Sequence, residues 1–483
     1  MQTQDENPKG QYRKVTLKNV PLWEPCAPAD ATEWLSPDTY PDAPSLDEPY
    51  PIRPIPLMEA SCPHLHVILQ PDGALWREGS LYLFERITVM GDKEQTVSGA
   101  ATDICDFMNK LYSHGKDLLD FEGPKFKRPT YFYKSELKKH IIAGERSRSY
   151  CNREIGSVQG MYRWFVNTRG FRPKQDMWES KSRFVNYTDR HGLLQTKEVI
   201  STDLTFRNSK SALTGRFIKD GGNLKPIPRE NQQLLLDTLI ALENPEMLLI
   251  HLVGITSGMR IQSISTLRHR SVKRGVGHAS DEYKFALYGI EMGEGHLVEA
   301  KNGKEQTVLL PAWMHNILDI YINSPRHQTR AKLSPIQDPD DQYVFLTRTG
   351  KPYYIAKADQ KLFNYSTEKA SALRQFCRKV IAQMQMKNKD FTYHLHDLRA
   401  TFGMNLLNDD MKKRDEGKMN QLEILDHLKN RLNHEDINVT MNYLRFYDEN
   451  PELQQAQSDF EVHLEGLVRT EMLSHEKLRP DLP

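Results

Sequence analysis

Six residues in the second half of the chain have side chains that together suit chemistry on a phosphodiester. They are two arginines, a lysine, two histidines and a tyrosine: Arg260, Lys301, His396, Arg399, His434 and Tyr443. Transfer of a phosphodiester by a protein nucleophile needs an oxygen nucleophile, cations for the non-bridging oxygens, a proton donor for the leaving 5′ oxygen and a base for the nucleophile. The six side chains include a candidate for each of these parts.

The first two candidates lie at predicted turns. Gly258 lets the chain turn at a helix end, after which the Arg260 guanidinium can hold a phosphate through two parallel donors. The Asn-Gly pair at 302–303 is typical of a two-residue hairpin and places Lys301 at its tip, within reach of a leaving oxygen. Alone, each is more often an ordinary surface residue, and Lys304 is an alternative to Lys301.

The other four candidates lie on predicted helices. His396 and Arg399 are three residues apart and so share a helical face, where one can exchange a proton and the other can grip a phosphate. An ordinary packed pair is the alternative, and His394 could replace His396. Tyr443 follows His434 by nine residues. A tyrosine on an amphipathic helix is usually a core residue.

Local signals place this tyrosine near the start of a helix. The helix is predicted to begin near Asp436, and Asn433 suits the left-handed position that closes the preceding helix. Leu444 and Phe446 can fill the core in place of Tyr443. Tyr447 lies four residues later on nearly the same face, but its distance from His434 does not fit.

In this order and spacing, the motifs resemble the tyrosine recombinase (phage integrase) pattern of Arg, Lys, His-x-x-Arg, Leu-Gly-His and Tyr. The resemblance spans residues 229–446. The block 149–167 is similar, less specifically, to the last part of the family's helical core-binding domain. Asn433 stands where glycine is usual, and Ser263 where an acidic residue is common. Residues 408–418 look like an insertion, either a surface loop or a partner contact.

The resemblance implies a role for each of the six residues. The two arginines would clamp the scissile phosphate, and Lys301 would protonate the leaving 5′ oxygen. His396 would assist as acid or base, and His434 would hydrogen-bond the phosphate. Tyr443 would attack to form a 3′-phosphotyrosyl link. No metal or other cofactor is implied, because the covalent link conserves the bond energy for rejoining.

Predicted helices and short strands would position these residues. Amphipathic helices are predicted at 229–243 and from Pro245 to about Gly258. Three short strands are predicted at 284–290, 297–300 and 306–310, and one extended stretch at 343–347 before a turn at 348–350. The rest of this half reads as helical. The predicted fold is mainly α with small β-sheets (α+β): a helical core-binding domain, a catalytic domain and an extended Pro-rich N-terminal region.

The first 60 residues carry eleven of the 27 prolines and ten Asp/Glu against five Lys/Arg. We expect an extended arm without regular ladders there, because proline lacks the amide donor. Residues 64–91 alternate apolar and polar types around Pro71-Asp72-Gly73, which predicts a small sheet or hairpin.

Residues 125–183 form a basic segment with fifteen Lys/Arg against five Asp/Glu, interleaved with aromatic residues. Such a surface would bind phosphates through counterion release, although a solvated charged face is an equal alternative. The candidate DNA-binding residues are Lys134, Lys138, Lys139, Arg146, Arg148, Arg153 and Arg163.

The predicted domains are a Pro-rich arm (1–60), a small domain of unknown role (61–120), a basic core-binding domain (121–224), a catalytic domain (225–449) and a C-terminal helix or tail (450–483) that could contact a neighbouring protomer. The composition is that of a globular protein, with 38% apolar and 27% charged residues. No membrane span or signal peptide is predicted. Five widely spaced cysteines without a CxxC pair favour free thiols in a cytoplasm.

The resemblance implies a site-specific recombinase or integrase that integrates or excises a mobile element. Its partners would be double-stranded DNA, further copies of the chain as a dimer to tetramer on DNA, and element-encoded accessory proteins; it would associate with the bacterial nucleoid when on DNA. Two enzymatic alternatives are a type IB topoisomerase and a hairpin-resolving enzyme. The third alternative is a catalytically silent DNA-binding accessory protein.

Overall fold

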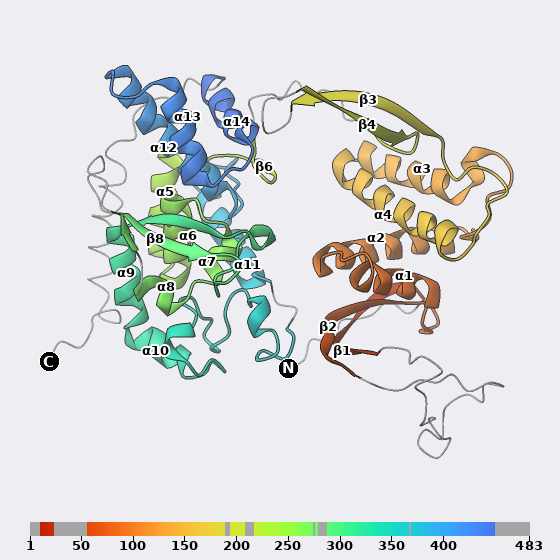
Figure 1. Cartoon of the computed structure of the whole chain (residues 1–483), viewed down its shortest axis with the longest axis horizontal. Helices are drawn as coiled ribbons and strands as arrows, with labels where there is room; N and C mark the ends of the chain where they lie inside the picture. The colour runs from red at the N-terminus through yellow and green to blue at the C-terminus, as the bar shows by residue number, and fades with distance from the viewer. Residues whose placement is uncertain are drawn as a thin grey trace, which may run out of the picture. The chain divides into compact units, whose positions relative to one another are not determined.

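The computed structural model describes residues 10–23, 56–188, 194–207, 217–273, 276–278, 287–366 and 369–449. The chain divides into two compact units, residues 1–211 and 212–483 (Figure 1). Both units are built mainly from helices with small antiparallel sheets, so the predicted fold class is confirmed.

The first unit combines a two-stranded sheet with four helices. Strand β1 (Arg13–Trp23) pairs antiparallel with β2 (Pro56–Leu69). The helices are α1 (Arg77–Thr88), α2 (Glu94–Ser113), α3 (Pro129–Ile142) and α4 (Arg148–Asn167), with a 3-10 turn η2 at Lys125–Lys127. The unit ends in a ribbon of β3 (Ser180–Thr188) and β4 (Leu194–Thr202).

One core holds this unit together. Apolar residues of α2 and α4 meet there, including Ile104 and Phe107 from α2 and Met161 and Tyr162 from α4, none of them more than 1% exposed. The helix predicted from the basic segment is therefore confirmed as α4, and its apolar face is buried. Cys105 and Cys151 lie free in the same core.

Of two predictions for the N-terminal residues, one is wrong and the other is correct in part. Residues 13–23 form a strand despite lying in the proline-rich region; Pro21, near its end, sits beside a register shift, where a missing amide is tolerated. The prediction of a small sheet or hairpin within residues 64–91 is correct in part: residues 64–69 belong to β2 of a two-stranded sheet, and an antiparallel bridge joins Leu69 to Leu75 across the turn, but residues 77–88 form helix α1. A short apolar run such as 81–84 fits either a helix or a strand, and here Tyr82 and Leu83 are buried on a helical face. Residues 56–60 of the predicted arm begin β2, and residues 1–9 and 24–55 lie outside the described residues.

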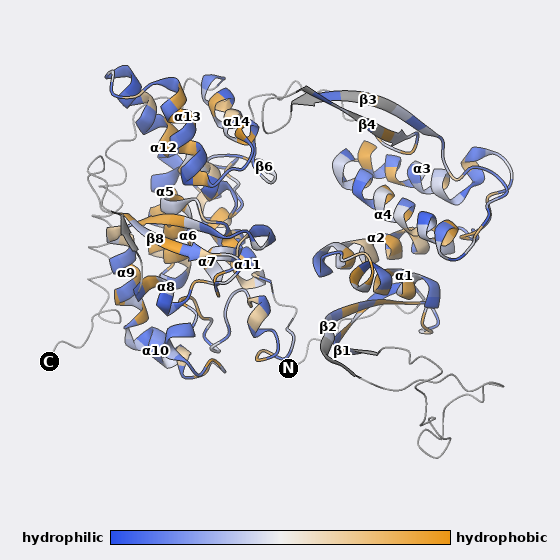
Figure 2. Ribbon diagram, viewed as in Figure 1, coloured by the Kyte–Doolittle hydropathy of each residue, from blue (hydrophilic) through white to orange (hydrophobic). Residues whose placement is uncertain are grey.

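The second unit is arranged around the buried helix α6. It opens with a short hairpin of β5 (Ile218–Lys219) and β6 (Asn223–Leu224), followed by α5 (Arg229–Ala241), α6 (Pro245–Ser257), α7 (Ile261–Ser265) and α8 (His269–Lys273). Every residue of α6 from Glu246 to Ser257 is buried. Figure 2 shows the hydrophobic colouring of this region of the unit around α6 and β8. The two predicted helices are confirmed as α5 and α6.

A three-stranded antiparallel sheet and further helices complete this unit. The sheet order is β7 (Val276–His278), β8 (Leu287–Met292), β9 (Gln306–Pro311), with a 3-10 turn η3 (Lys301–Gly303) in the loop before β9. Then follow α9 (Ala312–Ile322), α10 (Pro325–Ala331), η4 (Pro339–Asp341), η5 (Lys357–Asp359), α11 (Ser371–Gln385), α12 (Asp397–Asp415), α13 (Gln421–Leu432) and α14 (Ile437–Asp448).

The strand predictions for this unit are correct in part. Residues 306–310 are confirmed within β9, and β8 overlaps the prediction for 284–290. The prediction of a strand at 297–300 is wrong, because these residues lie in the loop between β8 and β9. Val298 and Ala300 are buried in the core, and the Gly293 amide donates to the Val298 carbonyl within the loop. Their apolar side chains are buried by packing in the core, so the alternating pattern arises without hydrogen bonding to another strand. The turn at 348–350 is confirmed by a bond from the Gly350 amide to the Thr347 carbonyl.

Within the described residues, no helix is both long and apolar enough to cross a membrane. The predicted C-terminal helix or tail, residues 450–483, lies outside the described residues.

Candidate active site

The turn of the β5–β6 hairpin carries an aspartate at the centre of a polar cluster. Asp220 Oδ2 accepts hydrogen bonds from Arg399 Nε at 2.7 Å, His434 Nε2 at 3.1 Å and the Tyr443 hydroxyl at 3.1 Å. Its other oxygen lies 3.6 Å from an Arg260 nitrogen. Four of the six predicted catalytic residues therefore surround one carboxylate.

The remaining two predicted residues lie beside the next residue of the same turn. A methyl group on Gly221 would lie 3.2 Å from Lys301 Nζ and 3.8 Å from His396 Cε1. The structure thus brings all six predicted side chains to residues 220–221. Among the sequence alternatives, Lys304 pairs with Glu435, and the His394 side chain is 88% exposed.

Arg399 is fixed by the ends of two helices. It lies in the first turn of α12 and is 5% exposed. Its Nη1 donates to the Gly258 carbonyl at 2.8 Å, and its Nη2 donates to the Leu432 carbonyl. These carbonyls belong to the C-terminal ends of α6 and α13, where helix carbonyls lack intrahelical partners. The arginine therefore joins three helices and points Nε at Asp220.

Arg260 depends on the left-handed turn at Gly258. Gly258 closes α6 with φ of 67°, which confirms the sequence prediction, and Arg260 is the residue that precedes α7. A Cβ at Gly258 would lie 2.6 Å from a Phe402 ring carbon, so conformation and space both require glycine here. Arg260 Nε is buried and has no hydrogen-bond partner among the described residues.

The nucleophile candidate is held by the last two helices. Asn433 ends α13 with φ of 53° and ψ of 45°, and Asp436 caps α14, so both sequence predictions are confirmed. His434 Nδ1 lies 2.9 Å from Thr440 Oγ1. The Tyr443 ring is fully buried against Gly403, at which a Cβ would lie 2.5 Å from Tyr443 Cε1. Glycine on α12 thus makes room for the ring.

The electrostatics of the cluster favour one set of protonation states. The Asp220 pKa is lowered well below its usual range, because the hydrogen bond from His434 and the charge and hydrogen bond of Arg399 outweigh the effect of its burial. Burial raises the pKa of Tyr443, so its hydroxyl keeps the proton that it donates to Asp220. Burial also lowers the pKa values of both site histidines and of Arg260. The neutral His434 ring then donates from Nε2 and accepts from Thr440.

Sequence reasoning missed Asp220. The residue lies just before the predicted domain boundary at 224–225, in a stretch to which no catalytic motif is assigned. No motif links an aspartate before two glycines to an arginine on a distant helix, and the contact exists only after folding. The hairpin is tied to α12 by bonds from the Lys225 amide to Asp397 Oδ1 and from the Ile227 amide to Thr401 Oγ1, both 2.9 Å.

The departure at Ser263 is buried, and part of the predicted insertion packs inward. Ser263 is 2% exposed in α7. Residues 408–415 of the predicted insertion continue helix α12, with Asn408, Asp410 and Met411 buried. The prediction of a surface loop is wrong for residues 408–415, which are helical and bury Asn408, Asp410 and Met411, but it fits residues 416–418, which form an exposed turn. His427 of α13 lies 2.6 Å from Asp410.

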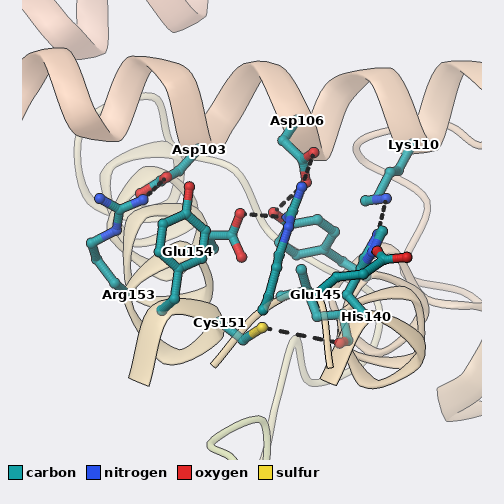
Figure 3. A network of polar contacts seen from close by, with 12 residues as sticks. Asp103, Asp106, Lys110, His140, Glu145, Cys151, Arg153 and Glu154 are labelled. Carbon is teal, nitrogen blue, oxygen red and sulfur yellow. Dashed lines mark hydrogen bonds and ion pairs between the residues drawn. The ribbon is translucent and has the colours of Figure 1, made fainter. Parts of the chain in front are cut away.

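Many of the basic residues predicted to bind DNA have partners inside the first unit. Arg146 pairs with Asp106 and Glu154, and Arg153 pairs with Asp103 at 2.8 Å (Figure 3). Lys134 donates to the Asp203 carbonyl. The arginine contacts tie α4 and the segment before it to α2, and the Lys134 contact ties α3 to the residue after β4, so the charges also have a structural role.

The other predicted DNA-binding residues are exposed. Lys139 pairs with Glu136, and Arg163 lies over the Trp178 ring. Lys138 and Arg148 are also exposed on this unit. Contact with DNA remains a prediction for all seven residues. No group of His, Cys, Asp or Glu among the described residues is arranged to hold a metal ion.

No protein-family model matches the chain, and no curated protein is similar to it by sequence. Among solved structures, it is similar to the Tn1549 transposon integrase in complex with transposon right end DNA, with 12% identity, coverage of 81% of this chain and 98% of that one, and a TM-score of 0.41. It is also similar to the same integrase in complex with circular intermediate DNA, with 13% identity, coverage of 76% of this chain and 94% of that one, and a TM-score of 0.41. The comparison with XerA recombinase gives 12% identity, coverage of 79% of this chain and 99% of that one, and a TM-score of 0.29. The functional assignment therefore rests on the site itself.

Proposed function

We propose that this chain is a site-specific DNA recombinase or integrase that cleaves and rejoins DNA strands through a 3′-phosphotyrosyl intermediate on Tyr443. The observation that carries the proposal is the convergence of six side chains, spread from residue 260 to residue 443, on one turn. Their types are those that phosphodiester transfer to a hydroxyl requires, and their order resembles the tyrosine recombinase motifs.

Each side chain has a distinct task in the proposed reaction. The guanidinium groups of Arg260 and Arg399 hold the non-bridging oxygens and stabilise the charge of the transition state. Tyr443 Oη attacks phosphorus, which forms the phosphotyrosyl bond and breaks the bond to the 5′ oxygen. Lys301 donates a proton to that leaving oxygen.

The histidines support the same step. His434 donates a hydrogen bond from Nε2, the nitrogen that faces the anion position. His396 Nε2 is buried without a partner among the described residues, and as the acid/base of the set it takes the proton that Tyr443 releases on attack. Rejoining is the reverse step with another 5′ hydroxyl, so the bond energy is conserved and no nucleotide is consumed.

The biological context that we propose is integration or excision of a mobile element. The partners are double-stranded DNA, further copies of the chain up to a tetramer on DNA, and accessory proteins of the element. A type IB topoisomerase uses a similar set of residues; it would relax any supercoiled plasmid, whereas a recombinase exchanges strands only at paired sites.

A covalent trapping experiment tests the proposal. The full chain is incubated with a library of nicked duplexes that includes DNA flanking its gene. Because of the nick, cleavage releases a short fragment that carries the 5′ hydroxyl, and its loss by diffusion prevents rejoining. We expect a denaturant-resistant adduct with the wild type, mapped to residue 443 by peptide mass spectrometry, and none with Tyr443→Phe. An undiminished adduct in the variant would contradict the assignment of the nucleophile.

A further inference from the structure

The donors that would bind a scissile phosphate already bind a carboxylate of the chain itself. Both a carboxylate and a phosphodiester are monoanions with two acceptor oxygens. Asp220 accepts from Arg399, His434 and Tyr443, the three groups assigned to the phosphate and to the attack on it, and it faces Arg260. The carboxylate therefore stands in the position of the substrate anion.

Access to the nucleophile is closed in this arrangement. Tyr443 is 0%, Arg399 5% and His434 7% exposed, and Asp220 itself is 3% exposed. A phosphodiester in duplex DNA cannot reach a fully buried hydroxyl that already donates to another anion. The next residue, Gly221, also lies against Lys301 and His396. The turn thus covers Tyr443, Arg399 and His434, whereas Lys301 beside it remains exposed.

Charge explains why an anion is needed here without DNA. Burial of Arg260 and repulsion from Arg399 both lower the pKa of Arg260, whereas Asp220 raises it. Two partly desolvated guanidinium groups close together are costly unless an anion neutralises them. Asp220 supplies that anion in the free protein.

The hairpin is anchored at its base but held at its tip mainly by the site. Ile218 and Leu224 are buried in the core that also contains Tyr443. At the tip, the Asp220 amide donates to the Gly222 carbonyl at 3.1 Å, and the side-chain amide of Asn442 donates to the Lys219 carbonyl at 3.1 Å. Two glycines in the turn allow it to change conformation while the base stays in place.

We propose that Asp220 is an internal occupant of the phosphate position, and that DNA binding exchanges its carboxylate for the scissile phosphodiester. This inference rests on the proposed function and gives its site a closed resting state. The competing role for Asp220 is that of proton acceptor for Tyr443. The ion pair with Arg399 lowers the pKa of Asp220 and makes it a weak base, which favours the role of occupant.

The first test measures binding of inorganic phosphate to the full chain by calorimetry. In Asp220→Asn the competing charge is gone, so we expect phosphate to bind at least tenfold more tightly than in the wild type. Asp237→Asn removes one exposed charge on α5 and serves as the matched control, with unchanged affinity. Added phosphate should also raise the Tm of Asp220→Asn more than that of the wild type, because binding to the folded state stabilises it.

A second variant weakens the turn and keeps the carboxylate. Gly221 has φ of 68°, where alanine is strained by about 1–2 kcal/mol, equivalent to a factor of about five or more. Gly221→Ala should therefore shift the turn away from the site and tighten phosphate binding by about fivefold. It keeps the test decisive if Asp220→Asn does not fold.

Adduct formation with a duplex recovered from the nicked library separates the possible outcomes. Support requires tighter phosphate binding together with an adduct rate at limiting DNA that is equal to or faster than in the wild type. Loss of the adduct in Asp220→Asn without tighter phosphate binding would overturn the inference and assign Asp220 to proton transfer. If no protein forms an adduct but phosphate binding still tightens, the proposed function fails and the internal occupancy of the anion site stands.

Discussion

Gly403 of α12 offers a test of how closely the fold positions Tyr443, the proposed nucleophile. A glycine inside a helix is normally a weakness, and its replacement by alanine gains about 1 kcal/mol. Here the added Cβ would lie 2.5 Å from Tyr443 Cε1, 3.0 Å from Cδ1 and 3.1 Å from Leu432 Cδ1. Carbon atoms in contact prefer about 3.5–4.0 Å, so the buried ring must move by about 1 Å.

Stability and activity should respond very differently to Gly403→Ala. Overpacking costs about 1–3 kcal/mol, which the helix gain partly offsets, so unfolding free energy should fall by about 0–2 kcal/mol. A displacement of about 1 Å at a reacting atom costs about 100-fold in rate. We therefore expect a folded protein with a Tm lowered by a few degrees and a roughly 100-fold slower formation of the covalent adduct.

The assay combines urea unfolding with single-turnover adduct formation. Gly156→Ala on α4 is the matched control, because nothing lies within 4 Å of the position that its added methyl group would take; it should stabilise its unit by about 0.5–1 kcal/mol without slowing the reaction. In a Tyr443→Leu background, which removes the ring, Gly403→Ala should lose most of its cost. An adduct rate within twofold of the wild type for Gly403→Ala would refute the proposed position of the reacting tyrosine.

Two further predictions concern stability. Arg399→Lys keeps the charge but loses the planar guanidinium that donates to Asp220 and to two helix-end carbonyls. Unpaired buried acceptors cost about 1–3 kcal/mol each, so urea unfolding should show a free energy of unfolding lower by about 2–5 kcal/mol, against less than about 0.5 kcal/mol for the exposed Arg445→Lys. Equal losses in the two variants would contradict this role of the guanidinium. His251 is fully buried, and burial lowers its pKa from 6.5 to about 4. Because the folded pKa lies below the unfolded one, the contribution of His251 to stability is complete above pH 6.5 and is lost as the pH falls toward about 4, for a total of up to about 3 kcal/mol at about 1.36 kcal/mol per pH unit. The free energy of unfolding, measured in urea across this pH range, should therefore fall more steeply with decreasing pH in the wild type than in His251→Phe. Parallel pH profiles for the two proteins would contradict this contribution of His251.

Local signals were enough to predict the parts of the fold that position the six residues. Gly258, Asn433 and Asp436 act through the backbone of their own helix ends, so sequence alone locates these ends. Predictions failed where burial is decided by distant partners. Residues 297–300 alternate like a strand but fill the core from a loop, and residues 81–84 lie on a helix that packs on the first unit's core.

The composition of the site shows the same division. Each of the six predicted residues belongs to a short motif, whereas Asp220 becomes part of the site only through contacts with residues 399, 434 and 443. A motif specifies chemistry, but whether the site is open depends on non-local packing. The motif residues supply the cations of the site, but no motif specifies Asp220, the anion that pairs with them in the free protein.

An internal carboxylate at the phosphate position also bears on specificity. Every duplex offers phosphates, so a preformed open site would bind any of them with similar affinity. If Asp220 must first be displaced, each tenfold increase in the ratio of closed to open site adds about 1.4 kcal/mol to the free energy cost of binding a phosphate. Only a duplex that makes enough contacts elsewhere on the protein repays this cost, and binding energy from those contacts is then used to assemble the catalytic site. The tyrosine would thus be exposed to DNA only after the correct site is bound, which protects other DNA from cleavage.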